Sequence, residues 1–331
     1  MGGKALNNIC YTRRYSREEY DKVIPEIVSI AKELFTDVHP TTFYKEKDSF
    51  GDADILVLLD KPLTINLKEW IKEKYNSKGV EVNSNCYSFE YKELQVDFIL
   101  TPLSNWETSK IYFSYNDIHN LIGKLFHKFG LKWGFDGLKY PYRLDGKMMG
   151  DISVSKDWRE CLSFVGLDPD RYADGFNNLD EIFDYVITSK YFNPWLYDLE
   201  NLNRINRERD KKRATYAKFL ERIEPMKERG KDAYFYFHPE KKYYLGLIDH
   251  YFPGFLKEYK SLEDKEVRKR KVHSLFNGNI LMERFGVKGT ELGKLIGDFQ
   301  KTFSSKEEME DWIIEVDDTE VIIEKVKELI N

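Results

Sequence analysis

One stretch decides the fold, residues 47–59, which reads KDSFGDADILVLL. Its second part, Ile55 to Leu59, is apolar and rich in branched side chains, which predicts a buried strand. Because side chains alternate along a strand, Asp52 and Asp54 at its beginning lie on one face. Two neighbouring carboxylates repel each other, so this pair is expected to be exposed or to share a cation.

A third acid lies in a similar setting further along the chain. Asp97 stands alone in the apolar stretch 94–100, LQVDFIL, where an unpaired carboxylate is costly to bury. Three carboxylates on adjacent strands would offer oxygen ligands to one or two Mg²⁺ ions, and two such ions can clamp an in-line phosphoryl displacement. The alternative is structural: Asp52 and Asp54 cap a turn, and Asp97 pairs with a buried Arg or Lys.

The composition sets the class of protein. With 331 residues, 41% of them hydrophobic and 33% charged, the chain is expected to form two or three globular domains. The net charge of −5 does not indicate nucleic-acid binding, although local patches matter more than the total. Three widely separated cysteines form no metal-ligand spacing and suit a reducing cytoplasm. No apolar run approaches the ~18 residues of a membrane span, and the N-terminus lacks the core of a signal peptide.

The periodicity predicts an α+β chain whose second half is mostly helical. A helix over 16–35 begins at a capping box formed by Ser16 and Glu19. Further helices are expected over 67–75, 117–130 and 156–165, and a hairpin over 139–155 turns at Asp145-Gly146. The chain is expected to be mostly helical from residue 172, with a closing amphipathic helix over 305–330. Strands are expected over 41–45, 52–59, 80–82, 87–91 and 94–100.

Two basic runs, residues 203–213 and 265–271, suggest contact with a phosphate backbone. If residues 204–218 form one continuous helix, one face of it carries Arg204, Arg207, Lys211 and Lys218. The alternative for each run is a solvated helix face. The candidate nucleic-acid contacts are Lys124, Arg204, Arg207, Lys211, Lys218, Arg268 and Arg270.

Five groups of motifs follow one another along residues 13–170. They are RxxREE at 14–19, FYK at 43–45 with SFGDAD at 49–54, VD at 96–97, YF at 112–113 with DIxN at 117–120, and SKDW at 155–158 leading into VGL at 165–167. In this order they resemble the catalytic palm and thumb of the family X DNA polymerases, the polymerase β-like branch of the nucleotidyltransferase superfamily.

The resemblance implies a role for each of these residues. Asp52 and Asp54 would hold two Mg²⁺ ions, and Asp97 would complete the catalytic one and activate a nucleic-acid 3′-hydroxyl. The implied nucleotide contacts are Arg14, Thr42, Lys45 and the backbone of Gly51 at the triphosphate, Tyr112 and Phe113 at the sugar, and Asp117 and Asn120 near the base.

The chain departs from the family pattern in several places. Thr41-Thr42 replaces the Gly-Ser of the phosphate turn, so the close backbone approach that glycine allows is lost unless Gly2-Gly3 substitutes for it. Tyr115-Asn116 replaces a second Gly-Ser, and Lys45 supplies a point charge where an Arg fork is usual. No lyase domain or helix-hairpin-helix grip precedes the palm, which argues against a gap-filling repair enzyme.

Residues 276–296 resemble the tail helices of bacterial tRNA nucleotidyltransferases and poly(A) polymerases, which share an Asn-Gly, a Gly-x-x-Gly turn and a Gly in the next helix. Gly289 and Thr290 predict a tight turn with an N-cap, where a helix N-terminus could hold an RNA phosphate. The alternative is a helix pair packed closely through Gly293 and Gly297. The whole chain resembles uncharacterised nucleotidyltransferases of tailed phages, which implies action in the cytoplasm of an infected cell.

These resemblances imply a palm over 1–105, a thumb-like nucleotide-contacting subdomain over 106–172, and a helical acceptor-binding region over 173–331. The expected activity is Mg²⁺-dependent transfer of NMP from an NTP to a nucleic-acid 3′-hydroxyl. RNA or tRNA is preferred to DNA as the acceptor, because the DNA-gripping domains are absent. Three alternatives stay open: a reduced family X polymerase using dNTPs on DNA, an enzyme that transfers NMP to protein, and a non-catalytic nucleic-acid-binding protein.

Overall fold

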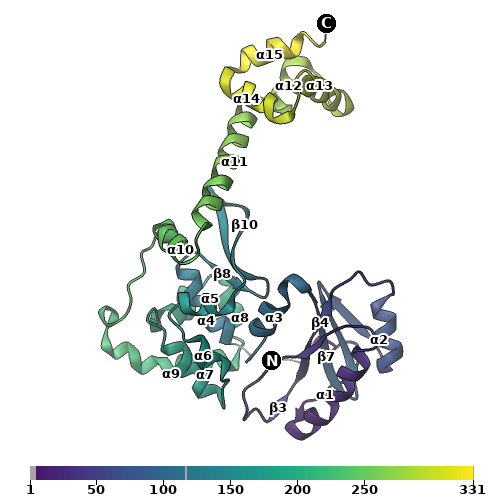
Figure 1. Cartoon of the computed structure of the whole chain (residues 1–331), viewed down its shortest axis with the longest axis vertical. Helices are drawn as coiled ribbons and strands as arrows, with labels where there is room; N and C mark the ends of the chain where they lie inside the picture. The colour runs from purple at the N-terminus through teal and green to yellow at the C-terminus, as the bar shows by residue number, and fades with distance from the viewer. Residues whose placement is uncertain (1–4, 116–117, 331) are drawn as a thin grey trace. The chain divides into compact units, whose positions relative to one another are not determined.

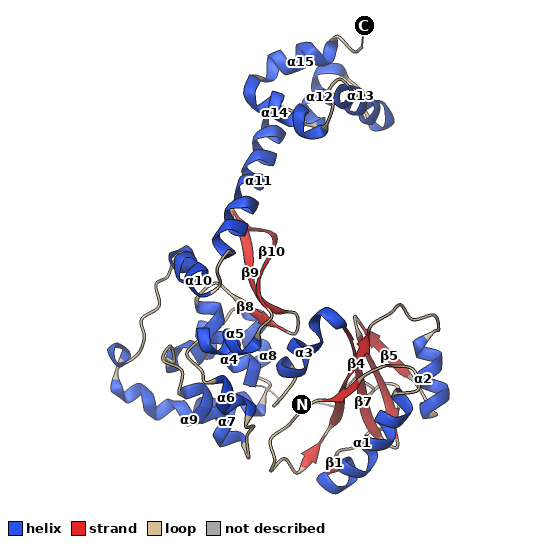
Figure 2. Cartoon of the chain, viewed as in Figure 1, coloured by secondary structure: helices blue, strands red, loops and turns tan. Residues whose placement is uncertain are grey.

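The computed structural model describes residues 5–115 and 118–330. The chain divides into two compact units, Met1–Pro253 and Gly254–Asn331, each with its own core (Figure 1). This division falls inside the region that the sequence analysis treats as one helical part. The α+β class is confirmed, because a mixed five-stranded sheet with helices occupies the N-terminal half and the C-terminal half is mostly helical (Figure 2).

The five-stranded sheet has the order β2-β4-β7-β6-β5. Its two central strands, β4 (Asp52–Leu59) and β7 (Leu94–Pro102), run parallel, and the other neighbours are antiparallel. The remaining strands are β2 (Val38–Pro40), β5 (Val80–Asn83) and β6 (Cys86–Tyr91).

The alternation of side chains along β4 sorts its residues between the two faces of the sheet. Ala53, Ile55 and Val57 are buried in the core that α1 (Arg17–Ala31) and α2 (Leu67–Tyr75) form on one face. On the other face Leu56 and Leu58 pack with Trp106 at the start of α3 (Trp106–Tyr112). Where β4 begins, the same face carries Asp52 and Asp54 instead of apolar residues. This part of the sheet therefore forms a polar site and not a hydrophobic core.

The N-terminus of α1 is built as the sequence predicts. Ser16 accepts from the backbone of Glu19, and the Glu19 carboxylate accepts from the backbone of Ser16, which completes the capping box. Just before the helix, β1 (Tyr15–Ser16) pairs with β3 (Ser49–Phe50), so the chain before α1 lies beside the loop that leads into β4.

The rest of the first unit joins a three-stranded antiparallel sheet, of order β10-β9-β8, to a group of helices. The hairpin of β9 (Gly137–Leu144) and β10 (Lys147–Ser155) turns at Asp145 and Gly146, both with positive φ, as predicted. The other elements are β8 (Lys132–Gly134), α4 (Ile118–Lys128), α5 (Trp158–Phe164), α6 (Pro169–Ala173), α7 (Leu179–Ile187), α8 (Arg204–Asp210), α9 (Ala214–Ile223) and α10 (Leu245–Tyr251).

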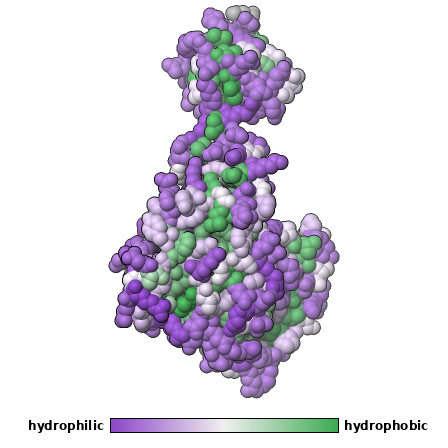
Figure 3. All heavy atoms as spheres, turned by 60° about the vertical axis from the view of Figure 1, so that its left-hand side comes forward, coloured by the Kyte–Doolittle hydropathy of each residue, from purple (hydrophilic) through white to green (hydrophobic). Residues whose placement is uncertain are grey.

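The second unit contains only helices among its described residues. They are α11 (Phe255–Leu275), α12 (Gly278–Phe285), α13 (Gly289–Lys301), α14 (Lys306–Val316) and α15 (Thr319–Lys327). Leu281, Phe299, Ile313, Ile322 and Val326 form its core. The visible face of each unit is mainly polar with apolar patches (Figure 3). None of the helices in the described part of the chain has the length and apolar character that a membrane span requires.

Several sequence-based boundaries are wrong. The stretch Thr41–Lys45 is not a strand, because Thr42 and Lys45 bond the backbone of Tyr115 and Phe176 instead of a neighbouring strand. The first long helix ends at Ala31 and not at residue 35. The expected closing helix over 305–330 is two helices, since the chain breaks at Asp317, whose φ is 49°.

The tail also differs from expectation. Lys288 occupies the N-cap position of α13, so Thr290 lies inside the helix and is not its cap. The alternative of close packing through Gly293 and Gly297 is wrong as well, because a Cβ added at either would meet nothing within 4 Å.

Candidate active site

Three carboxylates from the two central strands meet on one face of the sheet. The parallel register pairs Asp54 with Asp97, and Asp52 precedes Asp54 by two residues. One carboxylate oxygen from each of the three lies within 4.8 Å of the others. The structural alternative, in which Asp97 pairs with a buried Arg or Lys, does not describe this arrangement, because the nearest groups to Asp97 include two acids.

Burial and neighbouring negative charge raise the pKa of Asp54 and of Asp97. Burial, together with the charges of Asp52 and Asp97, raises the pKa of Asp54 to about 8, while Lys47 opposes the change. Burial also raises the pKa of Asp97 to about 6, with hydrogen bonds from Ser88 and Gln95 acting in the other direction. Closely spaced carboxylates of this kind are stabilised by a proton or by a cation.

A second layer of side chains orients Asp97. The buried amide of Gln95 donates to both oxygens of Asp97, at 3.0 and 3.1 Å. The Gln95 carbonyl in turn accepts from the backbone of Ala5 at 3.1 Å, which fixes the direction of the amide. Gln95 was not predicted from the sequence as part of the site, although Gln95 and Asp97 share a face at a spacing of two.

The donor set suits a hard divalent cation. It offers three carboxylates and no thiol or imidazole, which matches the oxygen preference of Mg²⁺. The site is partly accessible rather than sealed, so a substrate oxygen and water could complete the octahedral coordination that Mg²⁺ requires.

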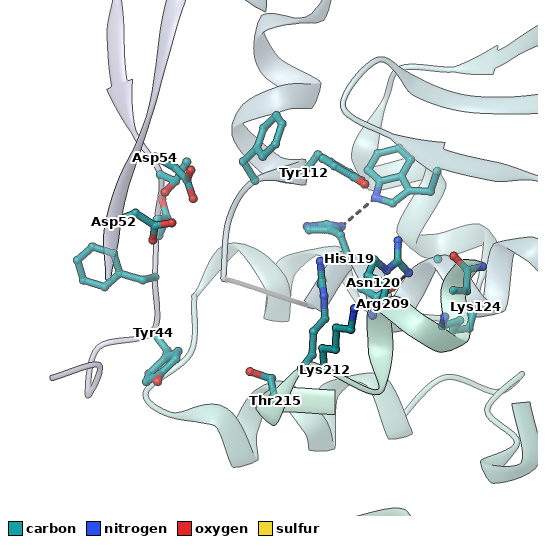
Figure 4. A pocket seen from close by; sticks show the side chains of 18 of the residues that line it. Tyr44, Asp52, Asp54, Tyr112, His119, Asn120, Lys124, Arg209, Lys212 and Thr215 are labelled. Atoms are coloured by element: carbon teal, nitrogen blue, oxygen red, sulfur yellow. Dashed lines mark hydrogen bonds between the residues drawn. The ribbon is translucent and has the colours of Figure 1, made fainter. Parts of the chain in front are cut away.

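Asp52 and Asp54 line a large cavity of the first unit, with a volume of about 1380 Å³. Asp52 and Asp54 lie on one side of it, and Tyr112, His119, Asn120 and Arg209 on the other (Figure 4). Every charged side chain among the described lining residues outside β4 is a cation. These cations are Arg14, Lys47, Lys124, Lys128, Lys132, Arg209, Lys212 and Arg213.

Most of the predicted nucleotide contacts line this cavity. Arg14 does so with its guanidinium bonded to the side chain and backbone of Ser49, so it is fixed beside the loop that leads to the acids. Asp117 lies outside the described residues, as do Gly2 and Gly3. The other predicted contacts that the structure brings to the cavity are Thr42, Gly51, Tyr112, Phe113 and Asn120.

The lysine of this loop that lines the cavity is Lys47, two residues after the predicted Lys45. Lys45 is exposed and is not among the described lining residues, whereas Lys47 lines the cavity and acts on the charge of Asp54. The Lys47 ammonium lies 4.6 Å from the centre of the Phe50 ring, a cation–π distance that favours this position. The loop conformation decides which of the two lysines lines the cavity, and residue spacing alone does not determine that conformation.

A buried ionic network connects α4 to α8. Lys124, only 8% exposed, lies 2.6 Å from Asp210, and Arg209 contacts the same carboxylate at 2.9 Å. Asn120 donates to Asp210 and accepts from Arg209. Lys124 therefore holds two helices together, a role that its prediction as a nucleic-acid contact did not include.

The aromatic side of the cavity is held by a chain of hydrogen bonds through His119. The Trp133 indole donates to Nδ1 of His119 at 2.8 Å, so Nε2 carries the proton and donates to the Tyr172 hydroxyl at 2.7 Å. Burial lowers the pKa of His119 to about 3, so the ring is neutral. Tyr112 lies against this ring with centroids 5.6 Å apart, so His119 supports the side chain that the resemblance assigns to the sugar.

The other predicted nucleic-acid contacts are not brought to the cavity. Residues 204–218 form two helices rather than one, so Arg204, Arg207, Lys211 and Lys218 do not share a face of a continuous helix. Arg207 donates to the carbonyls of Leu199, Glu200 and Leu202. In the second unit, Arg268 pairs with Glu310 and Asp311, and Arg270 belongs to the same helix, α11.

The basic residues that do line the cavity in this region are Arg209, Lys212 and Arg213, which the sequence analysis did not select. Their signal was present, since they belong to the basic run 203–213. The predicted contacts share a face only on one continuous helix, and the chain forms two helices here.

The comparisons with known proteins give a distant structural likeness. No family model and no curated protein matches the chain. Among solved structures, a ternary complex of polymerase β from Leishmania infantum is similar to it, with 13% sequence identity and a TM-score of 0.33. The match covers 43% of this chain and 63% of that polymerase, so it spans less than two thirds of the polymerase's length.

Proposed function

We propose that this chain is a magnesium-dependent nucleotidyltransferase that transfers NMP from an NTP to the 3′-hydroxyl of a nucleic acid, with an RNA or tRNA end preferred to DNA. The observation that carries the proposal is the group formed by Asp52, Asp54 and Asp97, whose oxygens lie within 4.8 Å of one another. A purely structural role would not favour three carboxylates this close together, two of which line a large cavity, since the charges of Asp52 and Asp97 raise the pKa of Asp54.

In this proposal the three carboxylates bind the metal, and Asp97 is the one that activates the attacking hydroxyl. When bound, Mg²⁺ would lower the pKa of that hydroxyl and stabilise the pyrophosphate leaving group. Gln95 keeps the Asp97 oxygens in a fixed direction, so the carboxylate does not have to reorganise when substrate binds.

The triphosphate would lie beside the loop that enters β4. Arg14 and Lys47 line the cavity there, and both supply positive charge near the acids. The backbone of Gly51 and the side chain of Thr42 complete this group of contacts. Lys47 takes the role that the sequence analysis gave to Lys45.

The nucleoside would lie against the opposite, aromatic side. Tyr112 and Phe113 pack edge to face at 5.3 Å, and Phe113 stacks on Phe135 at 6.2 Å. This surface is rigid because His119 and its partners support Tyr112 from behind. A preformed apolar surface would orient a sugar ring at a low entropic cost.

The test is an extension assay. Purified protein, Mg²⁺ and each α-labelled NTP or dNTP would be incubated with a tRNA pool, single-stranded RNA or gapped DNA. Label on RNA or tRNA supports the proposal, and label on DNA alone would identify a reduced DNA polymerase instead. Absence of label on every acceptor, with nucleotide binding retained, would contradict a nucleic-acid acceptor and direct the search to proteins.

A further inference from the structure

The end of α8 and the segment that joins it to α9 present a group of cations to the cavity, on the side opposite Asp52 and Asp54. Arg209, Lys212 and Arg213 all line it, and we call these three residues the α8–α9 wall. Figure 4 shows Arg209 and Lys212 on the side away from Asp52 and Asp54. The wall is therefore separate from the carboxylates that would bind metal.

The charge of Arg209 in this wall is only partly balanced by its carboxylate partner. Asp210 accepts from Arg209 and also pairs with the buried Lys124, so one carboxylate serves two cations. None of the described residues that line the cavity on this side is acidic. Burial lowers the pKa of Lys124, its contact with Asp210 opposes this change, and the positive charges of Arg209 and Arg213 lower the pKa further.

The backbone adds to this field. The helix α9 begins at Ala214, directly after Arg213, and no side chain among the described residues caps its N-terminus. Thr215 in its first turn lines the same cavity. Uncapped N–H groups at a helix start carry partial positive charge, so they act in the same direction as the three cations.

The size of the cavity indicates more than one ligand. Pockets for single small molecules are commonly about 300–1,000 Å³, and this one has about 1380 Å³. If the triphosphate occupies the side next to Asp52 and Asp54, where Arg14 and Lys47 lie, the opposite side is left for a second anionic ligand.

We propose that the α8–α9 wall binds the backbone phosphates of the acceptor strand near its 3′ end, as a site distinct from the triphosphate site. This inference rests on the proposed function and names the residues that position the acceptor. The wall suits a single strand, because three cations and a helix start can follow successive phosphates without reading bases. Its residues differ from the cations that the sequence pattern selects from the same basic run, none of which lines the cavity.

The experiment compares two matched double variants. Lys212→Ala/Arg213→Ala removes two cations of the wall, and Lys211→Ala/Lys218→Ala removes two from the same segment that do not line the cavity. Binding of a 5′-fluorescent single-stranded RNA with a free 3′-hydroxyl is followed by anisotropy over a range of salt concentrations, with Mg²⁺ and no nucleotide. Binding of Mg²⁺-ATP without RNA is measured separately by equilibrium dialysis.

The wall variant is expected to bind RNA about tenfold more weakly, while its ATP affinity changes less than about twofold. Its salt slope should be smaller by about 0.7 for each phosphate that the protein no longer neutralises. The Lys211/Lys218 variant should resemble the wild type in both assays. Loss of ATP binding with RNA binding intact would place the triphosphate at the wall and overturn the inference. Equal effects of both variants, or a larger effect of the second, would also overturn it.

Arg213 has contacts of its own, so a single exchange protects the test against a folding defect. Lys212→Glu and Lys211→Glu reverse the charge of adjacent residues, and only Lys212 lines the cavity. A loss of RNA binding with Lys212→Glu but not with Lys211→Glu supports the proposal that the α8–α9 wall binds RNA. The RNA-binding result is independent of catalysis. If no nucleotide is transferred to any acceptor but the two variants still differ in RNA affinity, the proposed chemistry is wrong and the proposed RNA contact of the α8–α9 wall is still supported.

Discussion

The amide nitrogen of Gln95 lies 3.0 and 3.1 Å from the two oxygens of Asp97, so one side chain holds this carboxylate at two points. The bond favours the ionised carboxylate, because an N–H donor stabilises negative charge. Ala5 holds the amide in this direction from the other side. The N-terminal segment is thus connected to the candidate metal ligands through one side chain.

Replacing Gln95 by leucine keeps a similar volume and removes the donor. The pKa of Asp97 is then expected to rise further, so Mg²⁺ binding at neutral pH should weaken by about 10- to 100-fold, the usual effect of losing an outer-shell partner. Isothermal titration with Mg²⁺ measures this, and the acid limb of the activity profile should move to higher pH. An unchanged Mg²⁺ affinity and an unchanged pH profile would show that Gln95 is only a packing residue.

Asp54→Asn should stabilise the metal-free protein while abolishing activity. The folded pKa of Asp54, about 8, is above its ordinary value, so the ionised carboxylate destabilises the fold increasingly as pH rises from about 4 to about 8. Removing the charge should recover on the order of 3 kcal/mol at pH 8, after allowance for screening. Thermal unfolding without Mg²⁺ measures the gain.

The exposed Asp48, which precedes the same strand, is the matched control. Asp48→Asn should leave the melting temperature nearly unchanged. Added Mg²⁺ should stabilise the wild type and Asp48→Asn but not Asp54→Asn. A lower melting temperature for Asp54→Asn without metal would contradict the account of repulsion among the three acids.

Mg²⁺ affinity should depend on pH in a defined window. The pKa of Asp97 is about 6 and that of Asp54 about 8, so one proton must leave for each metal bound between pH 6 and 8 and none above pH 8. The affinity should therefore rise by up to about tenfold for each pH unit across this window and then level off. Titration at several pH values tests this, and a constant affinity from pH 6 to 8 would exclude these carboxylates as the ligands.

Acid should destabilise the first unit through His119. Its folded pKa, about 3, is below the ordinary value of 6.5, so its contribution to stability is complete above pH 6.5 and is lost as pH falls toward 3. At pH 4.5 the loss is on the order of 3 kcal/mol. His119→Asn should be less stable at pH 7 but should lose less further stability between pH 6.5 and 4.5, as measured by urea unfolding. Parallel pH dependences of the two proteins would contradict this assignment.

The three acids could be predicted from sequence because their signal is local. Alternation puts Asp52 and Asp54 on one face, and a carboxylate inside the apolar stretch of Asp97 needs a reason to be there. The parallel register that brings Asp54 beside Asp97 confirms that these strands are neighbours. The capping box of α1 and the turn at Asp145-Gly146 were predicted for the same reason, since each depends on a few adjacent residues.

The rest of the site depends on contacts between distant segments. Lys47 lines the cavity and Lys45 does not, because the Lys45 N–H donates to the Phe176 carbonyl and the Tyr115 N–H donates to the Thr42 carbonyl, contacts that no local pattern reveals. The break between α8 and α9 likewise decides that Lys212 lines the cavity while Lys211 does not. Gln95 was overlooked because a polar residue beside an acid has no distinctive spacing of its own.

The central claim is that Asp52, Asp54 and Asp97 support nucleotidyl transfer, and one measurement tests it most directly. Wild type and Asp54→Asn would be incubated with Mg²⁺, an RNA pool and NTPs labelled on either the α- or the γ-phosphate. We expect the α-label in RNA and the γ-label in released pyrophosphate for the wild type, and neither for Asp54→Asn, although that variant remains folded. Equal incorporation by the two proteins would contradict the claim.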